Sequence, residues 1–268
     1  MERVQNGRNL AMFAGLWLIF SAILEYFAHL WVIHTPYYYV ASLQGEVSLD
    51  AFDTLVYVSV ILFVFIIMFM AFSAVRFRQR AGETGDSPVQ NQSNLLFQRS
   101  WMVLTIGIVM TFFLHPDLSG MEQLWAYGLP PWNHGALVVN VQARQWQFRF
   151  GYPQYGLPMN TKTDGRDVLV VPAGREIKFV MYSLDVTHSF YVPAWGVKAD
   201  IIPGITRDLY ITPTQITSTA VNPMVRLQCA QLCGAGHAYM EANVEVVSPQ
   251  AFAKWVAQEK AQVSSQNS

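Results

Sequence analysis

The chain has 268 residues, of which 52% are hydrophobic and only 13% are Asp, Glu, Lys or Arg. Soluble domains carry about 25% charged residues, so this composition argues against an entirely water-soluble protein. The formal net charge is −1, so the chain has no excess of basic residues for a nucleic-acid-binding surface, and no nucleic-acid partner is expected. Two cysteines exclude a disulfide-rich scaffold, and since they lie only four positions apart they predict one local site.

Three apolar runs, at about residues 10–33, 54–75 and 95–116, predict transmembrane helices. A helix rises 1.5 Å per residue, so about 20 residues cross the roughly 30 Å hydrocarbon core of a bilayer. The third run is long enough only if it includes all of 95–116, and a buried core helix is its alternative. A cleaved signal peptide is the alternative for the first run, but no small-residue cleavage site follows Ile33.

The loops predict the orientation of these helices. Arg3 and Arg8 precede the first run, residues 34–53 contain three acidic residues and no Lys or Arg, and residues 76–100 contain four Arg. Basic residues favour the cytoplasmic side. We therefore expect residues 1–116 to form the transmembrane region with a cytoplasmic N-terminus, and the rest of the chain to lie outside.

Residues 117–250 are expected to form a β-sandwich. Residues 116–268 carry 11 acidic and 11 basic side chains, which is an ordinary globular balance. Short alternating segments between Gly and Pro turns are typical of a sandwich. Residues 251–268 are predicted to form a C-terminal tail helix. The expected strands cover residues 136–143, 144–150, 168–171, 176–181, 188–193, 208–212, 225–229 and 242–247.

A cluster of soft ligands near the end of this domain predicts a metal site. Cys229, Cys233, His237 and Met240 follow the pattern Cys-x3-Cys-x3-His-x2-Met, and His188 lies about 40 residues upstream. Thiolates and a thioether favour copper, which imidazole also suits. A disulfide, a zinc site with two Cys and two His, and a blue-copper site with one surplus Cys are the alternatives. Two copper ions that share both thiolates would use every donor.

The chain resembles subunit II of the haem–copper oxidases, in the cytochrome c oxidase branch that carries the binuclear copper centre CuA. The resemblance covers about residues 54–248 and rests on three blocks: 145–153, 185–204 and 228–240. The quinol-oxidising relatives lack the copper ligands, all of which are present here. The resemblance implies a membrane-anchored all-β protein, with transmembrane helices followed by a cupredoxin-like CuA domain.

The resemblance also implies the role of each ligand in a centre of two copper ions. Cys229 and Cys233 would bridge the two ions. His188 and Met240 would complete one ion, and His237 with the backbone carbonyl of Gln231 would complete the other. Trp146 matches the tryptophan at which the family accepts electrons, although a core aromatic in an alternating strand is the alternative.

The implied function is electron relay. An external donor, cytochrome c or a similar one-electron carrier, would reduce CuA, and the electron would pass to haem in subunit I for oxygen reduction coupled to proton pumping. The expected partners are subunit I, other oxidase subunits and the lipid bilayer of a prokaryotic plasma membrane, with the CuA domain on the periplasmic face. No Cys-x-x-Cys-His motif occurs, so no covalent haem is expected in this chain. A CuA subunit of a nitric oxide reductase and a membrane-anchored copper chaperone are the alternatives.

The chain departs from the family pattern in three places. Gln231 stands where most members have Glu, and Gln98 stands where the family commonly has Glu, three residues before a Trp. The helix at 10–33 is additional to the usual two, and it carries Glu25 and His29 one turn apart. An ionisable pair inside a membrane is a candidate functional site, or it can bond to a neighbouring subunit.

Overall fold

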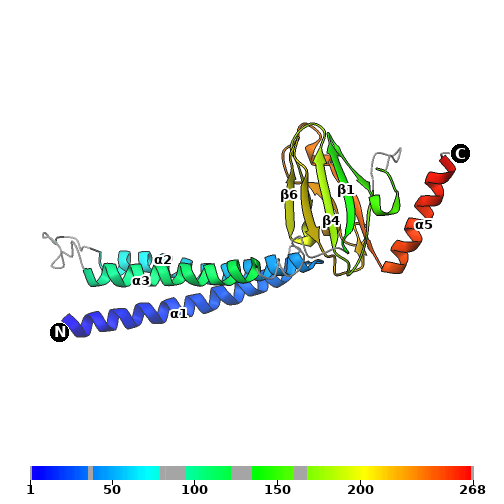
Figure 1. The fold of residues 1–268 in the computed structure, drawn as a ribbon. Coiled ribbons are helices and arrows are strands. Elements are labelled where there is room, and N and C mark those ends of the chain that lie inside the picture. The colour runs from blue at the N-terminus through cyan, green and yellow to red at the C-terminus, as the bar shows by residue number, and fades with distance from the viewer. Residues whose placement is uncertain are drawn as a thin grey trace. The chain divides into compact units, whose positions relative to one another are not determined.

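The computed structural model describes residues 2–35, 39–78, 82, 95–121, 135–159 and 168–266. The chain divides into two compact units, which are described separately. A helical unit comprises Met1–Thr35 and Asp50–Ser119, and a β unit comprises Pro36–Leu49 and Gly120–Ser268 (Figure 1).

The helical unit contains three long helices: α1 (Glu2–His34), α2 (Leu43–Arg76, whose first residues belong to the β unit) and α3 (Leu95–Phe112). All three are long and apolar enough to cross a membrane, over Gly7–Val32, Leu43–Arg76 and Leu95–Met121. Beyond α3, the helical turn Phe113–Leu118 is interrupted at His115, which is extended, with φ −147° and ψ 123°. Pro116 explains this kink, because a proline disfavours the helical conformation of the residue before it.

Helices α1 and α2 pack through aromatic side chains. Phe13 contacts Phe65 edge-on, with ring centroids 5.7 Å apart, and Trp17 Nε1 donates a hydrogen bond to the Ile61 carbonyl over 3.2 Å. His29 Nδ1 lies 2.9 Å from the Tyr57 hydroxyl. The histidine on the additional helix therefore has a polar partner inside the helical unit.

The β unit consists of two sheets, which confirms the expected fold class of apolar N-terminal helices followed by a β-sandwich. The first sheet has the order β2-β1-β4-β7, with β1 parallel to β4 and the other pairs antiparallel. Its strands are β1 (Leu137–Arg144), β2 (Gln147–Gly151), β4 (Ile177–Ser183) and β7 (Arg207–Ile211). Alternate residues of β1 and β4 are buried, so this sheet has one face on the core.

The second sheet has the order β3-β10-β9-β5-β6, and the short strand β8 pairs with β10. Its strands are β3 (Val168–Pro172), β5 (His188–Val192), β6 (Val197–Ile201), β8 (Thr217–Ser218), β9 (Leu227–Cys229) and β10 (Glu241–Val247). The sequence does not predict β6 or β8. β6 is an edge strand with little burial and β8 has only two residues, so neither has a clear hydrophobic alternation.

Helix α5 (Pro249–Gln266) follows β10 at the C-terminus. Ser248 precedes it and its hydroxyl accepts a hydrogen bond from the Ala251 N–H over 3.2 Å, as an N-cap does. Phe252 and Val256, one turn apart, are buried in the core of the β unit, and Tyr152 contacts the Phe252 ring. The helix is thus amphipathic and packs on the domain through one face.

The first turn of α2 belongs to the β unit, where we name residues 40–45 the anchor segment. Ser42 Oγ donates to the Trp195 carbonyl over 2.8 Å and accepts from the Gly45 N–H over 2.9 Å. The Thr212 N–H donates to Gln44 Oε1 over 2.9 Å. Gly196 has a positive φ of 69°, and a Cβ there would lie 2.6 Å from Gly45 Cα. α2 therefore begins at Leu43, ahead of the apolar run at 54–75, because Ser42 caps it.

Candidate metal centre

The second sheet brings the predicted ligands together from three places in the chain. His188 opens β5 and Cys229 closes β9, and these strands pair with Phe190 opposite Cys229. The loop after β9 carries Cys233 and returns to β10 through Met240, whose carbonyl accepts a hydrogen bond from the Cys229 N–H over 3.0 Å. This backbone bond closes the loop, so both of its ends are held by the sheet.

The two thiols are buried and close but not joined. Cys229 Sγ lies 3.7 Å from Cys233 Sγ, and both cysteines are free. His188 is fully buried, and its Nδ1 lies 4.0 Å from Cys229 Sγ. The ligand atoms of His188, Cys229 and Cys233 all lie within 4.8 Å of one another, which makes them a group that could hold a metal ion.

The remaining donors also lie close to the two sulfurs. His237 Nδ1 lies 3.5 Å from Cys233 Sγ but falls outside the mutual group formed by His188 and the cysteines. Met240 Sδ lies 3.8 Å from Cys233 Sγ, and the Gln231 carbonyl oxygen lies 3.2 Å from Cys229 Sγ. His188 therefore lies beside Cys229, whereas His237 lies beside Cys233 and also bonds to Cys229. One four-coordinate zinc ion would need two imidazoles around the same point as the thiolates, but the mutual group contains only one imidazole.

Asp185 orients the His188 ring from outside the ligand set. Its Oδ1 lies 2.8 Å from His188 Nε2, so Nδ1 is the ring nitrogen that faces the thiols. The carboxylate also accepts hydrogen bonds from the Gln145 N–H and the Val186 N–H, each over 2.7 Å. Burial opposes its ionisation, but these bonds outweigh burial and lower the Asp185 pKa. A carboxylate that holds a histidine in this way is a common feature of metal sites.

The two thiols differ in how readily they ionise. Burial opposes ionisation of Cys229, but hydrogen bonds from His188, from backbone groups and from His237 lower its pKa to about 6. Burial together with the negative charge of Cys229 raises the pKa of Cys233 to about 12. The pocket therefore stabilises one thiolate by itself, and a bound cation would supply the charge that allows two.

Trp146 lies against the cysteine loop rather than in the core. It sits in the turn between β1 and β2, outside the alternation of the buried Phe148 and Phe150, and is 42% exposed. Its indole Nε1 donates to the Cys233 carbonyl over 3.3 Å, and Gln145 Nε2 donates to the same oxygen over 2.9 Å.

Two glycines make this contact between loop and indole close. Gly234, with φ 115°, turns the loop directly after Cys233. At Gly236 an added Cβ would overlap the indole of Trp146. The indole therefore packs directly on loop backbone.

Sequence reasoning assigned no role to Asp185 or Gln145. Both stand in the blocks that carry the resemblance, and the spacing of Asp185 three residues before His188 was the available signal. The Gln231 side chain is exposed, and only its backbone carbonyl faces the thiols.

Comparison with known proteins confirms the resemblance. A family model described as the periplasmic domain of cytochrome c oxidase subunit II matches residues 137–247. A probable cytochrome c oxidase subunit 2 of Rickettsia bellii is 27% identical over 220 residues, which cover 76% of each chain. An alternative cytochrome c oxidase subunit 2 of Bradyrhizobium diazoefficiens is 26% identical over 275 residues, covering 93% of this chain and 92% of that one.

Among solved structures, the chain is similar to the periplasmic domain of subunit II of cytochrome oxidase from Bradyrhizobium japonicum. That match has 28% sequence identity and a TM-score of 0.43, and covers 50% of this chain and 99% of the other.

Proposed function

Since residues 137–247 belong to the family of cytochrome c oxidase subunit II periplasmic domains, we propose that this chain accepts electrons for a terminal haem–copper oxidase through a binuclear CuA centre. The observation that carries the proposal is the pair of buried thiols 3.7 Å apart, with the His188 ring beside Cys229 and the His237 ring beside Cys233. This arrangement suits two copper ions that share both thiolates, because copper favours thiolate, thioether and imidazole donors.

The donor set assigns a place to every ligand. Cys229 and Cys233 would bridge the ions, and His188 and Met240 would complete one of them. His237 and the Gln231 carbonyl would complete the other. A bound copper pair would supply a one-electron carrier whose charge is shared between two ions.

The protein contributes a rigid and dry surrounding for this electron transfer. His188, Cys233 and Met240 are almost fully buried, which keeps water away from the ligands. Asp185 fixes the His188 ring, and the hydrogen bond between Cys229 and Met240 fixes the ends of the loop. Ligands that are already in place need little rearrangement when the charge of the site changes.

Trp146 would receive the electron from the donor. Its exposed indole is hydrogen-bonded to the backbone of Cys233, which would give a short covalent and hydrogen-bonded route from the surface to a copper ligand. Leu232 and Tyr239 on the same loop are 79% and 84% exposed. We infer that a protein donor, cytochrome c or a similar carrier, docks over these apolar groups.

The membrane region completes the proposal. Three helices capable of spanning a bilayer would anchor the chain in a prokaryotic plasma membrane with a cytoplasmic N-terminus. The β unit would then lie on the periplasmic side, beside the subunit I that reduces oxygen and pumps protons.

Copper analysis of the purified full-length chain tests the proposal. We expect two copper ions per chain and a mixed-valence electron-spin resonance signal, with Cys229→Ser and Cys233→Ser each abolishing the signal. Met240→Leu is the matched control and should keep the binuclear signal, since a thioether is a weak ligand. One copper per chain, or a mononuclear blue-copper signal, would contradict the proposal. Oxygen consumption by the purified complex distinguishes an oxidase from a nitric oxide reductase.

A further inference from the structure

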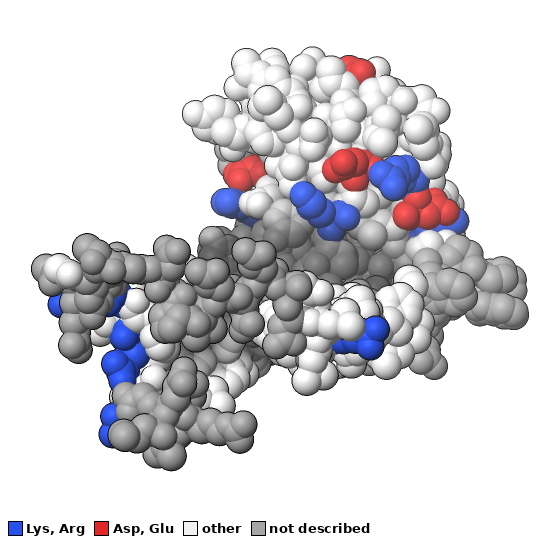
Figure 2. All heavy atoms as spheres, turned by 90° about the vertical axis from the view of Figure 1, so that its left-hand side faces the viewer, with Lys and Arg blue, Asp and Glu red and all other residues white. Residues whose placement is uncertain are grey.

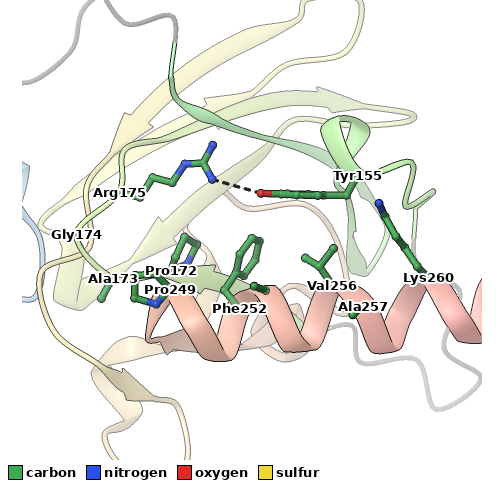
Figure 3. Close-up of a pocket in the computed structure, with 11 residues that line it drawn as sticks. Tyr155, Pro172, Ala173, Gly174, Arg175, Pro249, Phe252, Val256, Ala257 and Lys260 are labelled. Atoms are coloured by element: carbon green, nitrogen blue, oxygen red, sulfur yellow. Dashed lines mark hydrogen bonds between the residues drawn. The ribbon is translucent and has the colours of Figure 1, made fainter.

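A groove of about 510 Å³ lies between helix α5 and the turn that joins β3 to β4 (Figure 3). Phe252 and Val256 of α5 form an apolar floor, and the Tyr155 ring lies above them. Small-molecule sites in proteins measure about 300–1,000 Å³ and are mostly apolar with a few polar groups. The groove meets this description, and none of its lining residues belongs to the metal centre.

The walls of the groove are held in place by the fold. In the turn, the Ala173 N–H donates to the Val247 carbonyl over 2.8 Å and the Gly174 N–H donates to the Pro213 carbonyl over 2.7 Å. Gly174 has a φ of 72°, which lets the chain reverse directly before Arg175. Tyr155 meets Phe252 edge-on, with ring centroids 5.8 Å apart. The groove is therefore preformed.

Two cations border the groove, and none of the described residues that line it is acidic. Arg175 donates to the Tyr155 hydroxyl over 3.3 Å and to the Gly135 carbonyl over 3.2 Å, both of which are uncharged. Lys260 Nζ lies 5.8 Å from the centre of the Tyr155 ring. Within the ranges that the structure describes, neither cation forms an ion pair with a carboxylate.

The position of Lys260 on α5 also places a positive charge at the groove. Residues 252, 256 and 260 follow one another at four-residue spacing, so they lie along one face of α5. The first two are buried apolar residues, and the third is a lysine beside the same groove. The inward face of the helix therefore changes from apolar to cationic within the groove.

We propose that this groove binds a small aromatic carboxylate. The apolar body would lie along α5 over Ala253 and Ala257, which line the groove and are exposed, and the carboxylate would accept a forked pair of hydrogen bonds from Arg175. Figure 3 shows the Arg175 guanidinium directed across the groove toward Tyr155, with Lys260 on the other side of that ring. The positive charge of Lys260 would attract the carboxylate electrostatically without touching it. The size of the cavity favours a small molecule over a protein partner.

Binding can be measured by fluorine NMR with the full-length, copper-loaded chain in lipid nanodiscs. The probe is 6-fluoronaphthalene-2-carboxylate, and its neutral amide and empty nanodiscs are the ligand and membrane controls. We expect saturable broadening of the probe signal, with the amide binding roughly tenfold more weakly because it loses the charge-assisted hydrogen bonds.

Variants locate the site. Arg175→Gln should weaken binding roughly tenfold or more, Arg175→Lys less, and Lys260→Gln a few-fold. Lys254→Gln is the matched control, because Lys254 lies on the same helix outside the groove. The copper spectrum of each variant verifies the fold, since the groove shares no residue with the metal centre.

Several outcomes would overturn the proposal: no saturable binding, equal binding of the amide, or equal binding by Arg175→Gln. Equal weakening by Lys254→Gln would show a general charge effect and would also reject the site. If a peptide with a C-terminal phenylalanine bound more than tenfold tighter than the probe, the occupant would be a protein rather than a small molecule.

Discussion

At the scale of single residues, Asp185 links the His188 ring to the turn that carries Trp146. It accepts from the Gln145 N–H and bonds to His188 Nε2 with the same carboxylate. Asp185→Asn keeps the shape but replaces a charged acceptor by a neutral one. We expect copper affinity to fall about 10–100-fold, the usual effect of changing such a supporting group. Competition with a copper chelator measures the change, and Asp200→Asn on β6 is the control. An affinity within twofold of the parent chain would show that Asp185 does not support the site.

Trp146 offers a second prediction at this scale. Trp146→Ala should leave the copper spectrum unchanged but slow electron transfer from a protein donor far more than transfer from a small artificial reductant. Gly236→Ala should act in the same direction, because the added Cβ would overlap the indole and displace it. Gly107→Ala is the control, since a Cβ there meets open space. Equal losses with both reductants would mean that Trp146 serves only the fold.

At the scale of elements, the anchor segment joins the start of α2 to the β unit. Ser42→Ala removes the helix cap and leaves the buried Trp195 carbonyl without its hydroxyl donor. These losses cost roughly 1 kcal/mol and 1–3 kcal/mol. We expect the unfolding temperature of the β unit to fall by roughly 5 °C or more in a thermal scan of the full chain. Ser48→Ala, which removes only a bond to a carbonyl within the same helix, should change it far less. Equal shifts would show that the capping geometry is unimportant.

The same elements show which parts of the structure could be predicted from the sequence. The three helices follow from the length of the apolar runs, and most strands follow from the alternation of apolar and polar residues. The candidate ligands follow from their spacing and the family resemblance. The start of α2 could not be predicted, because Ser42 is held by Trp195, which lies 153 positions away. The place of Trp146 outside its strand was missed for the same reason, because it depends on how the β1–β2 turn meets the cysteine loop. The contact of Asp185 with His188 is local, but its bond to the Gln145 N–H spans 40 positions.

At the scale of the whole molecule, charge is evenly balanced in the part of the chain that we expect to meet the electron donor. Residues 116–268 carry 11 acidic and 11 basic side chains, and Figure 2 shows both signs side by side on one face of the β unit. Such a balance provides little long-range steering of a charged partner. The exposed Leu232 and Tyr239 instead favour apolar contact.

This balance predicts a weak dependence of donor oxidation on salt. Between about 20 and about 200 mM salt, the rate should change less than roughly threefold, because screening removes only long-range attraction. Leu232→Ser should slow electron transfer from the protein donor, whereas Val221→Ser, which removes an apolar side chain of similar exposure outside the cysteine loop, should not. A steep fall of the rate with salt would assign docking to charge.

The anchor segment also has a consequence for the order in which the protein is made. Its partners include Trp195, Thr212 and Gln215, and the hydrogen bond from Gln215 to the Val40 carbonyl spans 175 positions. At about 5–20 residues per second, a ribosome needs roughly 10–30 s to synthesise the residues between Ser42 and its partner. During this time the first turn of α2 has only water to bond, although the rest of the helix is already complete. Helix α2 is therefore synthesised early, and its first turn is capped late, when the β unit that supplies these partners has folded.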